Sequence, residues 1–169
     1  MSHSYYEGCF VNGAKEGKGK SVYPSGNVYD GEWKQGKRHG EGLMQWTQRN
    51  EEYIGGWREG LQHGYGEHYW HVPSVACRRH HENHYKGQWA EGRRHGNGTF
   101  SYASGEVYRG LYMNHQKHGP GCFWYDDGRS YVGDFFHDRP VGPIPTFANG
   151  TVQSLALARS CLSLSYALK

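Results

Sequence analysis

Residues 29–46 read YDGEWKQGKRHGEGLMQW, and this stretch decides the fold because its pattern recurs along the chain. It begins with a tyrosine, a glycine and a tryptophan at alternate positions, and it continues with Gly40, Gly42 and then Trp46. Side chains alternate between the two faces of a β-strand, so residues at alternate positions share one face. The stretch therefore predicts two short strands joined by a tight turn, with glycines and rings on one face.

The same unit occurs six times, with a period of about 23 residues and one insertion before the fourth copy. Its leading residues are Tyr6, Tyr29, Tyr53, Tyr85, Tyr108 and Tyr131. A period of this length is typical of a stacked array of one supersecondary unit. We expect an all-β protein, an elongated single-layer antiparallel sheet of six consecutive β-hairpins, in which each strand glycine lies under a ring from the neighbouring hairpin.

The repeat pattern also sets the expected domain boundaries. The array is predicted to cover residues 1–150, with an insertion at about 71–84, and a tail of different composition covers residues 151–169. Leucines in the tail fit either a helix or a strand, and we expect a short helix that caps the last hairpin. A membrane-contacting tail is a second interpretation.

Charge and hydropathy exclude some classes of function. The chain has 19 basic and 16 acidic residues, a net charge of +3, and the two signs are interspersed, which does not favour nucleic-acid binding. Its first residues lack the apolar run of a signal peptide, and no stretch has the length of a membrane span. We expect a protein of the cytoplasm and cytoskeleton.

Two groups of histidines are candidates for chemistry. The insertion contains His71, Cys77, His80, His81 and His84, but it offers one cysteine and no second ligand pair, so an exposed loop is favoured over a zinc site. A histidine also precedes the Gly-x-Gly sequence in four units, at His39, His63, His95 and His118. This row is either a pH-responsive ladder or the preferred residue of the repeat, and we favour the second interpretation.

The unit Tyr-x-Gly-x-Trp, a turn and then His-Gly-x-Gly resembles the MORN repeat. That resemblance implies a sheet of hairpins. Residues 26–29, 38–42, 50–53 and 102–105, together with the insertion, resemble more closely the MORN-containing radial spoke proteins of motile cilia and sperm flagella. This closer resemblance implies an axonemal protein whose partners are other radial spoke head components.

The sequence shows no nucleophile beside a base and no pair of catalytic acids, so we expect no enzyme activity, no metal and no cofactor. The expected function is a structural scaffold that binds protein partners through the ring-bearing face of the sheet. Candidate contact residues are Phe10, Trp33, Trp57, Trp89, Tyr112 and Phe135. The alternative is a peripheral membrane or phosphoinositide-binding module, since basic residues gather near the hairpin turns.

Overall fold

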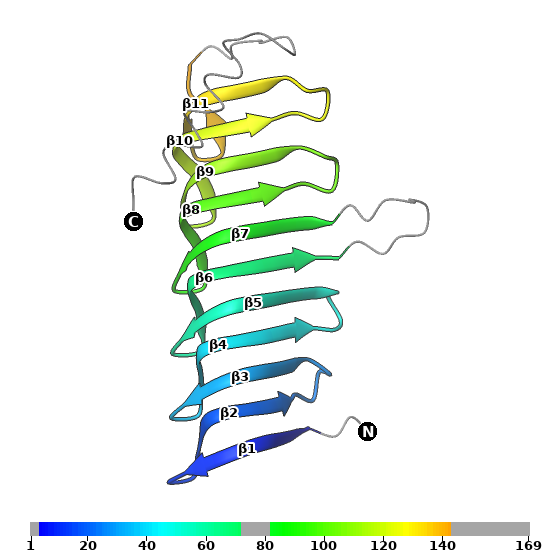
Figure 1. The fold of residues 1–169 in the computed structure, drawn as a ribbon, viewed down its shortest axis with the longest axis vertical. Coiled ribbons are helices and arrows are strands. Elements are labelled where there is room, and N and C mark those ends of the chain that lie inside the picture. Colours follow the sequence, from blue (N-terminus) through cyan, green and yellow to red (C-terminus); the bar gives the residue numbers. More distant parts are fainter. Residues whose placement is uncertain (1–3, 72–81, 143–169) are drawn as a thin grey trace.

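A computed structural model describes residues 4–71 and 82–142. These residues form one antiparallel sheet of 12 strands, and each strand pairs with its neighbours in the sequence (Figure 1). The predicted all-β, single-layer array of hairpins is confirmed. No helix occurs within the described ranges, and the proposed capping helix falls in the tail, which lies outside them.

The strands form six hairpins. Their first strands are β1 Tyr5–Val11, β3 Val28–Lys34, β5 Glu51–Arg58, β7 Asn83–Ala90, β9 Val107–Met113 and β11 Ser130–Phe136. Their second strands are β2 Ala14–Val22, β4 Lys37–Trp46, β6 Leu61–Trp70, β8 Arg93–Ser101, β10 Gln116–Trp124 and the short β12 Arg139–Pro140. The second strand of the sixth hairpin has only two residues within the described ranges.

Each hairpin closes through two residues that both have positive φ. In the second hairpin these are Gln35 at 49° and Gly36 at 78°, and in the sixth they are His137 and Asp138, at 48° and 68°. Two positive φ values in a two-residue loop define the turn whose twist matches the twist of the flanking strands. Glycine supplies this conformation without a steric cost at Gly36, whereas the first position of the turn accepts other residues.

The two glycines of each Gly-x-Gly sequence have different roles. Gly40, the first of the pair in β4, has a φ of 57°, and the pairing of β3 with β4 shifts register between Gly31 and Glu32. An irregularity of this kind bends the strand that carries it. Similar shifts occur in the other hairpins from the first to the fifth. Figure 1 shows the strands bending near the hairpin tips.

The second glycine of the pair lies beneath a ring of its own hairpin. Tyr29 covers Gly31 on its own strand and Gly42 on the paired strand, and a Cβ atom at Gly42 would overlap the tyrosine ring. The expectation that the ring comes from the neighbouring hairpin is therefore wrong. A tyrosine directly above these two positions reaches both glycines without leaving its own pair of strands.

Neighbouring hairpins are joined at their tips by backbone hydrogen bonds. The second turn residue of each hairpin after the first donates its N–H to a carbonyl oxygen of the preceding hairpin, at 2.9 to 3.1 Å. The accepting carbonyls belong to Lys15, Arg38, Gln62, Arg94 and Lys117. These five residues hold equivalent positions, so the array fixes the backbone of each of them in the same way.

Candidate functional site: the aromatic face

The leading tyrosines and the aromatic residues four positions later form a continuous column of rings, here called the inner column. Tyr29 contacts Trp33 of its own strand and Trp57 of the next hairpin edge to face, with centroids 5.1 and 5.4 Å apart. Contacts of this kind run without interruption from Tyr6 to Tyr131. Edge-to-face pairs each stabilise a fold beyond the area that they bury.

From the second hairpin onward the inner column is buried, and hydrogen bonds hold its polar atoms, as Tyr53 and Trp57 show. Tyr53 is fully buried, and its hydroxyl donates to the Gly56 carbonyl at 2.9 Å. Burial raises the pKa of the Tyr53 hydroxyl well above its usual value of 10, so it stays protonated. The indole Nε1 of Trp57 donates to the Gly42 carbonyl of the preceding hairpin at 3.0 Å. This column holds the hairpins together.

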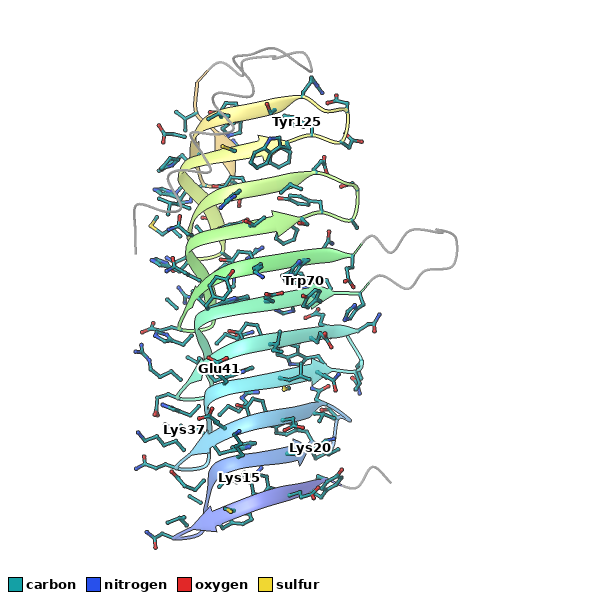
Figure 2. The ribbon with its side chains drawn as sticks, in the orientation of Figure 1. Lys15, Lys20, Lys37, Glu41, Trp70 and Tyr125 are labelled. Carbon is teal, nitrogen blue, oxygen red and sulfur yellow. The ribbon has the colours of Figure 1, made fainter. Side chains whose placement is uncertain are left out.

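A second column of rings, the outer column, lies on the same face nearer the turns between hairpins. Its ring contacts have centroid separations between 4.0 and 5.9 Å. Its members are Trp46, His68, Trp70, Phe100, Tyr102, Phe123 and Tyr125. Most of these rings are only partly buried, and Figure 2 labels Trp70 and Tyr125 among them. The outer column therefore offers ring surface to a ligand.

His68 is the one histidine in the outer column. Its ring stacks on Trp70 with the centroids 4.0 Å apart, and on Trp46 from the other side at 5.4 Å. Its Nε2 atom lies 3.3 Å from a carboxylate oxygen of Glu51. Burial, with a smaller effect from Arg94, nevertheless lowers the pKa of His68 from 6.5 to about 4. His68 is therefore a neutral aromatic ring at neutral pH.

Four cations occupy equivalent positions of their hairpins on the aromatic face: Lys15, Arg38, Arg94 and Lys117, here called the cation row. The guanidinium of Arg94 lies 5.5 Å from the ring centroid of Tyr112 in the inner column and 5.4 Å from that of Phe100 in the outer column. The ammonium of Lys117 is similarly placed, 5.4 Å from Tyr108 and 4.9 Å from Phe123.

The other two members of the cation row lie over rings of the inner column. Lys15 lies 4.3 Å from the Trp33 ring, and its ammonium donates to the Ser21 hydroxyl at 2.9 Å. Arg38 lies 4.5 Å from the Trp57 ring and donates to the Gly60 carbonyl at 2.7 Å. Cations over ring faces are attracted by the ring quadrupole. The third hairpin interrupts the row, because Gln62 stands in the equivalent position.

No member of the cation row forms an ion pair with a carboxylate within residues 4–71 and 82–142. The opposite face of the sheet differs. There Lys86 lies 2.7 Å from Glu67, and this hydrogen bond lowers the pKa of the Glu67 carboxyl. Tyr69 also donates to Glu67, at 2.7 Å, which raises the pKa of the Tyr69 hydroxyl to about 12. The four cations of the row thus have no ion-pair partner in the described ranges.

The six candidate contact residues divide into one exposed ring and five buried ones. Phe10 is 59% exposed, whereas the rings at the same position of the other hairpins are 4 to 5% exposed. Those buried rings are Trp33, Trp57, Trp89, Tyr112 and Phe135. They join the hairpins, and a contact between them and a partner stays a prediction. Sequence reasoning noticed the aromatic that ends each unit but did not propose the outer column or the cation row as a site.

The two groups of histidines singled out in the sequence lie at the base of the insertion and before the Gly-x-Gly sequences. The insertion lies mostly outside the described residues, but His71 and His84 are both present at its base, where each stacks on Tyr69, with centroids 6.1 and 4.2 Å apart. In the row before the Gly-x-Gly sequences, the Nδ1 atoms of His39, His63 and His118 are buried without a hydrogen-bond partner in the described structure.

The described residues contain neither a metal-binding cluster nor a membrane-spanning helix. Within those ranges, no group of three or more histidine, cysteine, aspartate or glutamate residues is placed to hold a metal ion. The same ranges contain no helix with the length and apolar character needed to cross a membrane.

Comparison with known proteins defines the family. The model of the MORN repeat matches the chain at residues 6–28, 29–50, 53–71, 85–107 and 108–128, which together make up more than half of it. The chain belongs to the MORN-repeat family. The sixth hairpin lies beyond the last matched segment.

Alsin from human and from mouse is also similar to part of the chain. Each is 44% identical over 81 residues, which is 48% of this chain and 5% of Alsin. The chain therefore matches only a small part of the length of these relatives.

Proposed function

We propose that this chain is a non-catalytic scaffold that binds protein partners along its aromatic face. The observation that carries the proposal is the outer column, a continuous row of rings, most of them partly buried, beside the inner column. Partly buried Trp, Tyr and Phe side chains offer large, rigid contact area at little cost in conformational entropy. The inner column keeps the hairpins in fixed positions, so a partner would meet a preformed surface.

We further propose that the scaffold works in the axoneme of motile cilia or sperm flagella, in association with the radial spokes. The support is the resemblance of residues 26–29, 38–42, 50–53 and 102–105 to radial spoke head 10 homologue B. That protein also has an insertion at the place of residues 71–84. On this proposal the partners are other radial spoke head components.

A peripheral membrane module is the competing proposal, and the charges at the hairpin tips give it little support. Lys37, at the tip of the second hairpin (Figure 2), forms an ion pair with Glu59 of the third at 2.6 Å. Paired charges of this kind contribute little to attraction by an anionic membrane surface.

Detergent extraction of motile ciliated cells or sperm tests the proposal. The demembranated axonemes are separated from the detergent fraction, and the chain is located by immunoblot. Retention with the axoneme is the expected result. Complete release into the detergent fraction would contradict the axonemal scaffold and favour the membrane module.

A further inference from the structure

We infer that the aromatic face recognises an acidic protein segment, through carboxylates that pair with the cation row. This inference rests on the proposed function, because it specifies the chemistry of the partner that the aromatic face would bind. It goes further than the hydrophobic contact offered by the outer column, since it assigns a charge and a spacing to the ligand.

The first step of the argument is the absence of internal counter-ions. Lys15, Arg38, Arg94 and Lys117 interact with rings, hydroxyl groups and a carbonyl, and within the described ranges none of them has a carboxylate partner. Other basic residues of the sheet, such as Lys37 and Lys86, do have one. A partner's carboxylate would complete the charge pairing of the row without displacing an internal ion pair.

The second step is that the array holds these cations in place before a ligand binds. The carbonyl of each cation residue accepts a hydrogen bond from the next hairpin, and each side chain lies over one or more rings. A charged group that is already positioned loses less conformational entropy on binding than a free lysine or arginine. Partial burial also lowers the pKa of Lys15, which shows that its ammonium is partly desolvated.

The third step is geometric. Cations of adjacent hairpins are two strands apart, which corresponds to about 9.5 Å across a sheet. Lys15 and Arg38 form one such pair, Arg94 and Lys117 form another, and Gln62 separates the two pairs. A segment in the polyproline II conformation has three residues per turn and rises about 3.1 Å per residue, so glutamates at every third position share one face, about 9.3 Å apart, and would meet adjacent cations. Beside Arg94 and Lys117, rings on either side of the cation row would accept the apolar residues between the glutamates.

The test measures binding of the full chain to a synthetic peptide with glutamate at every third position and leucine or valine between. A control peptide has glutamine in place of each glutamate. The double variant R94Q/K117Q removes one cation pair, and K86Q is the matched control, since Lys86 carries its charge on the opposite face. Circular dichroism confirms that each variant retains its strands.

We expect the glutamate peptide to bind and the glutamine peptide to bind much more weakly. The double variant should lose affinity roughly ten-fold, while K86Q keeps it. Equal binding of the two peptides, or unchanged affinity of the double variant, would overturn the inference. Binding to phosphatidylserine vesicles through the same two cations, without peptide binding, would also overturn it, because the ligand would then be a membrane surface.

Retention by demembranated axonemes separates this inference from the proposed function. If the wild-type chain is retained and R94Q/K117Q is retained equally, the acidic segment is excluded and the scaffold stands. If the wild-type chain is not retained, the axonemal scaffold fails whatever the peptides show. Retention of the wild-type chain and of K86Q, with loss of the double variant, is the result that we expect.

Discussion

Glycine and tyrosine are complementary at the residue scale in this array. The hydroxyl of each leading tyrosine reaches a carbonyl three residues along its own strand, and in the first five hairpins this brings the ring down onto two glycines. A methyl group at either glycine would lift the ring from this position. The abundance of glycine in the chain, 26 residues in 169, therefore reflects packing as well as turns.

Substitution of Gly42 tests this packing. Gly42→Ala places a methyl group against the Tyr29 ring, so we expect a loss of about 1 to 3 kcal/mol in the free energy of unfolding. Gly36→Asn is the matched control, because the space around Gly36 is open and asparagine accepts its φ of 78°. Urea unfolding measures both. A loss as large for Gly36→Asn as for Gly42→Ala would contradict the packing argument.

Removing the ring four positions after the leading tyrosine should cost more stability where that ring is buried between hairpins than where it is exposed. Trp57 is 4% exposed and bonds to the preceding hairpin, so Trp57→Ala should cost about 3 to 5 kcal/mol. Phe10 holds the same position in the first hairpin but is 59% exposed, so Phe10→Ala should cost less than about 1 kcal/mol. Similar losses in urea unfolding for both variants would show that the inner column does not join the hairpins.

The lowered pKa of His68 predicts that the free energy of unfolding depends on pH. Its pKa is about 4 in the folded protein and near 6.5 when unfolded, so the unfolded state binds more protons between these values. Stability is full above pH 6.5 and is lost as the pH falls towards 4, with about 2 kcal/mol lost between pH 7 and pH 5. His68→Phe introduces the residue type that Phe100 provides at the equivalent position of the next hairpin, and this variant should lose correspondingly less. Urea unfolding at pH 7 and pH 5 measures the loss of stability in each chain. An equal loss in the wild-type chain and in His68→Phe would exclude this role.

At the scale of the element, the hairpin turn limits which residues the repeat can accept. Both residues of every turn have positive φ, yet the first is a glutamine or glutamate in three hairpins. Those side chains tolerate the left-handed region less well than asparagine or glycine. The turns of the second, third and fourth hairpins are therefore less stable than the Asn12-Gly13 turn of the first.

The second turn gives a direct test. Gln35→Asn creates the same dipeptide as the first hairpin, and we expect the free energy of unfolding to rise by about 0.5 to 1 kcal/mol. Gln35→Val, a β-branched residue at a φ of 49°, should lower it instead. Urea unfolding of the two variants should show shifts of opposite sign, and shifts of the same sign would contradict this description of the turn.

The hairpins were predictable from sequence, but their contacts were only partly so. Alternation of tyrosine, glycine and tryptophan in residues 29–33 defines a strand and its face, and Gln35-Gly36 marks the turn. The pattern does not distinguish a ring above its own hairpin from a ring above its neighbour. Both arrangements place aromatic side chains over glycine, and periodicity does not reveal which of them the fold adopts.

At the scale of the whole molecule, the array presents two faces of different chemistry. The aromatic face combines half-buried rings with cations that lack internal carboxylate partners in the described ranges, whereas the opposite face carries ion pairs and scattered exposed apolar residues such as Ile54 and Tyr65. The cation row was missed in the sequence because its members are separated by a whole repeat and mixed with other basic residues. Only the fold places them in a line on the aromatic face.

The most direct test of the scaffold compares axonemal retention of variants on the two faces. Tyr102→Ala with Tyr125→Ala removes two half-buried rings of the outer column, and Ile54→Ala with Tyr65→Ala removes two exposed apolar side chains of the opposite face. Circular dichroism first establishes that both double variants keep their strands. We expect demembranated axonemes to retain the opposite-face variant and release the aromatic-face variant. Equal retention of the two variants would contradict the claim that partners bind along the aromatic face.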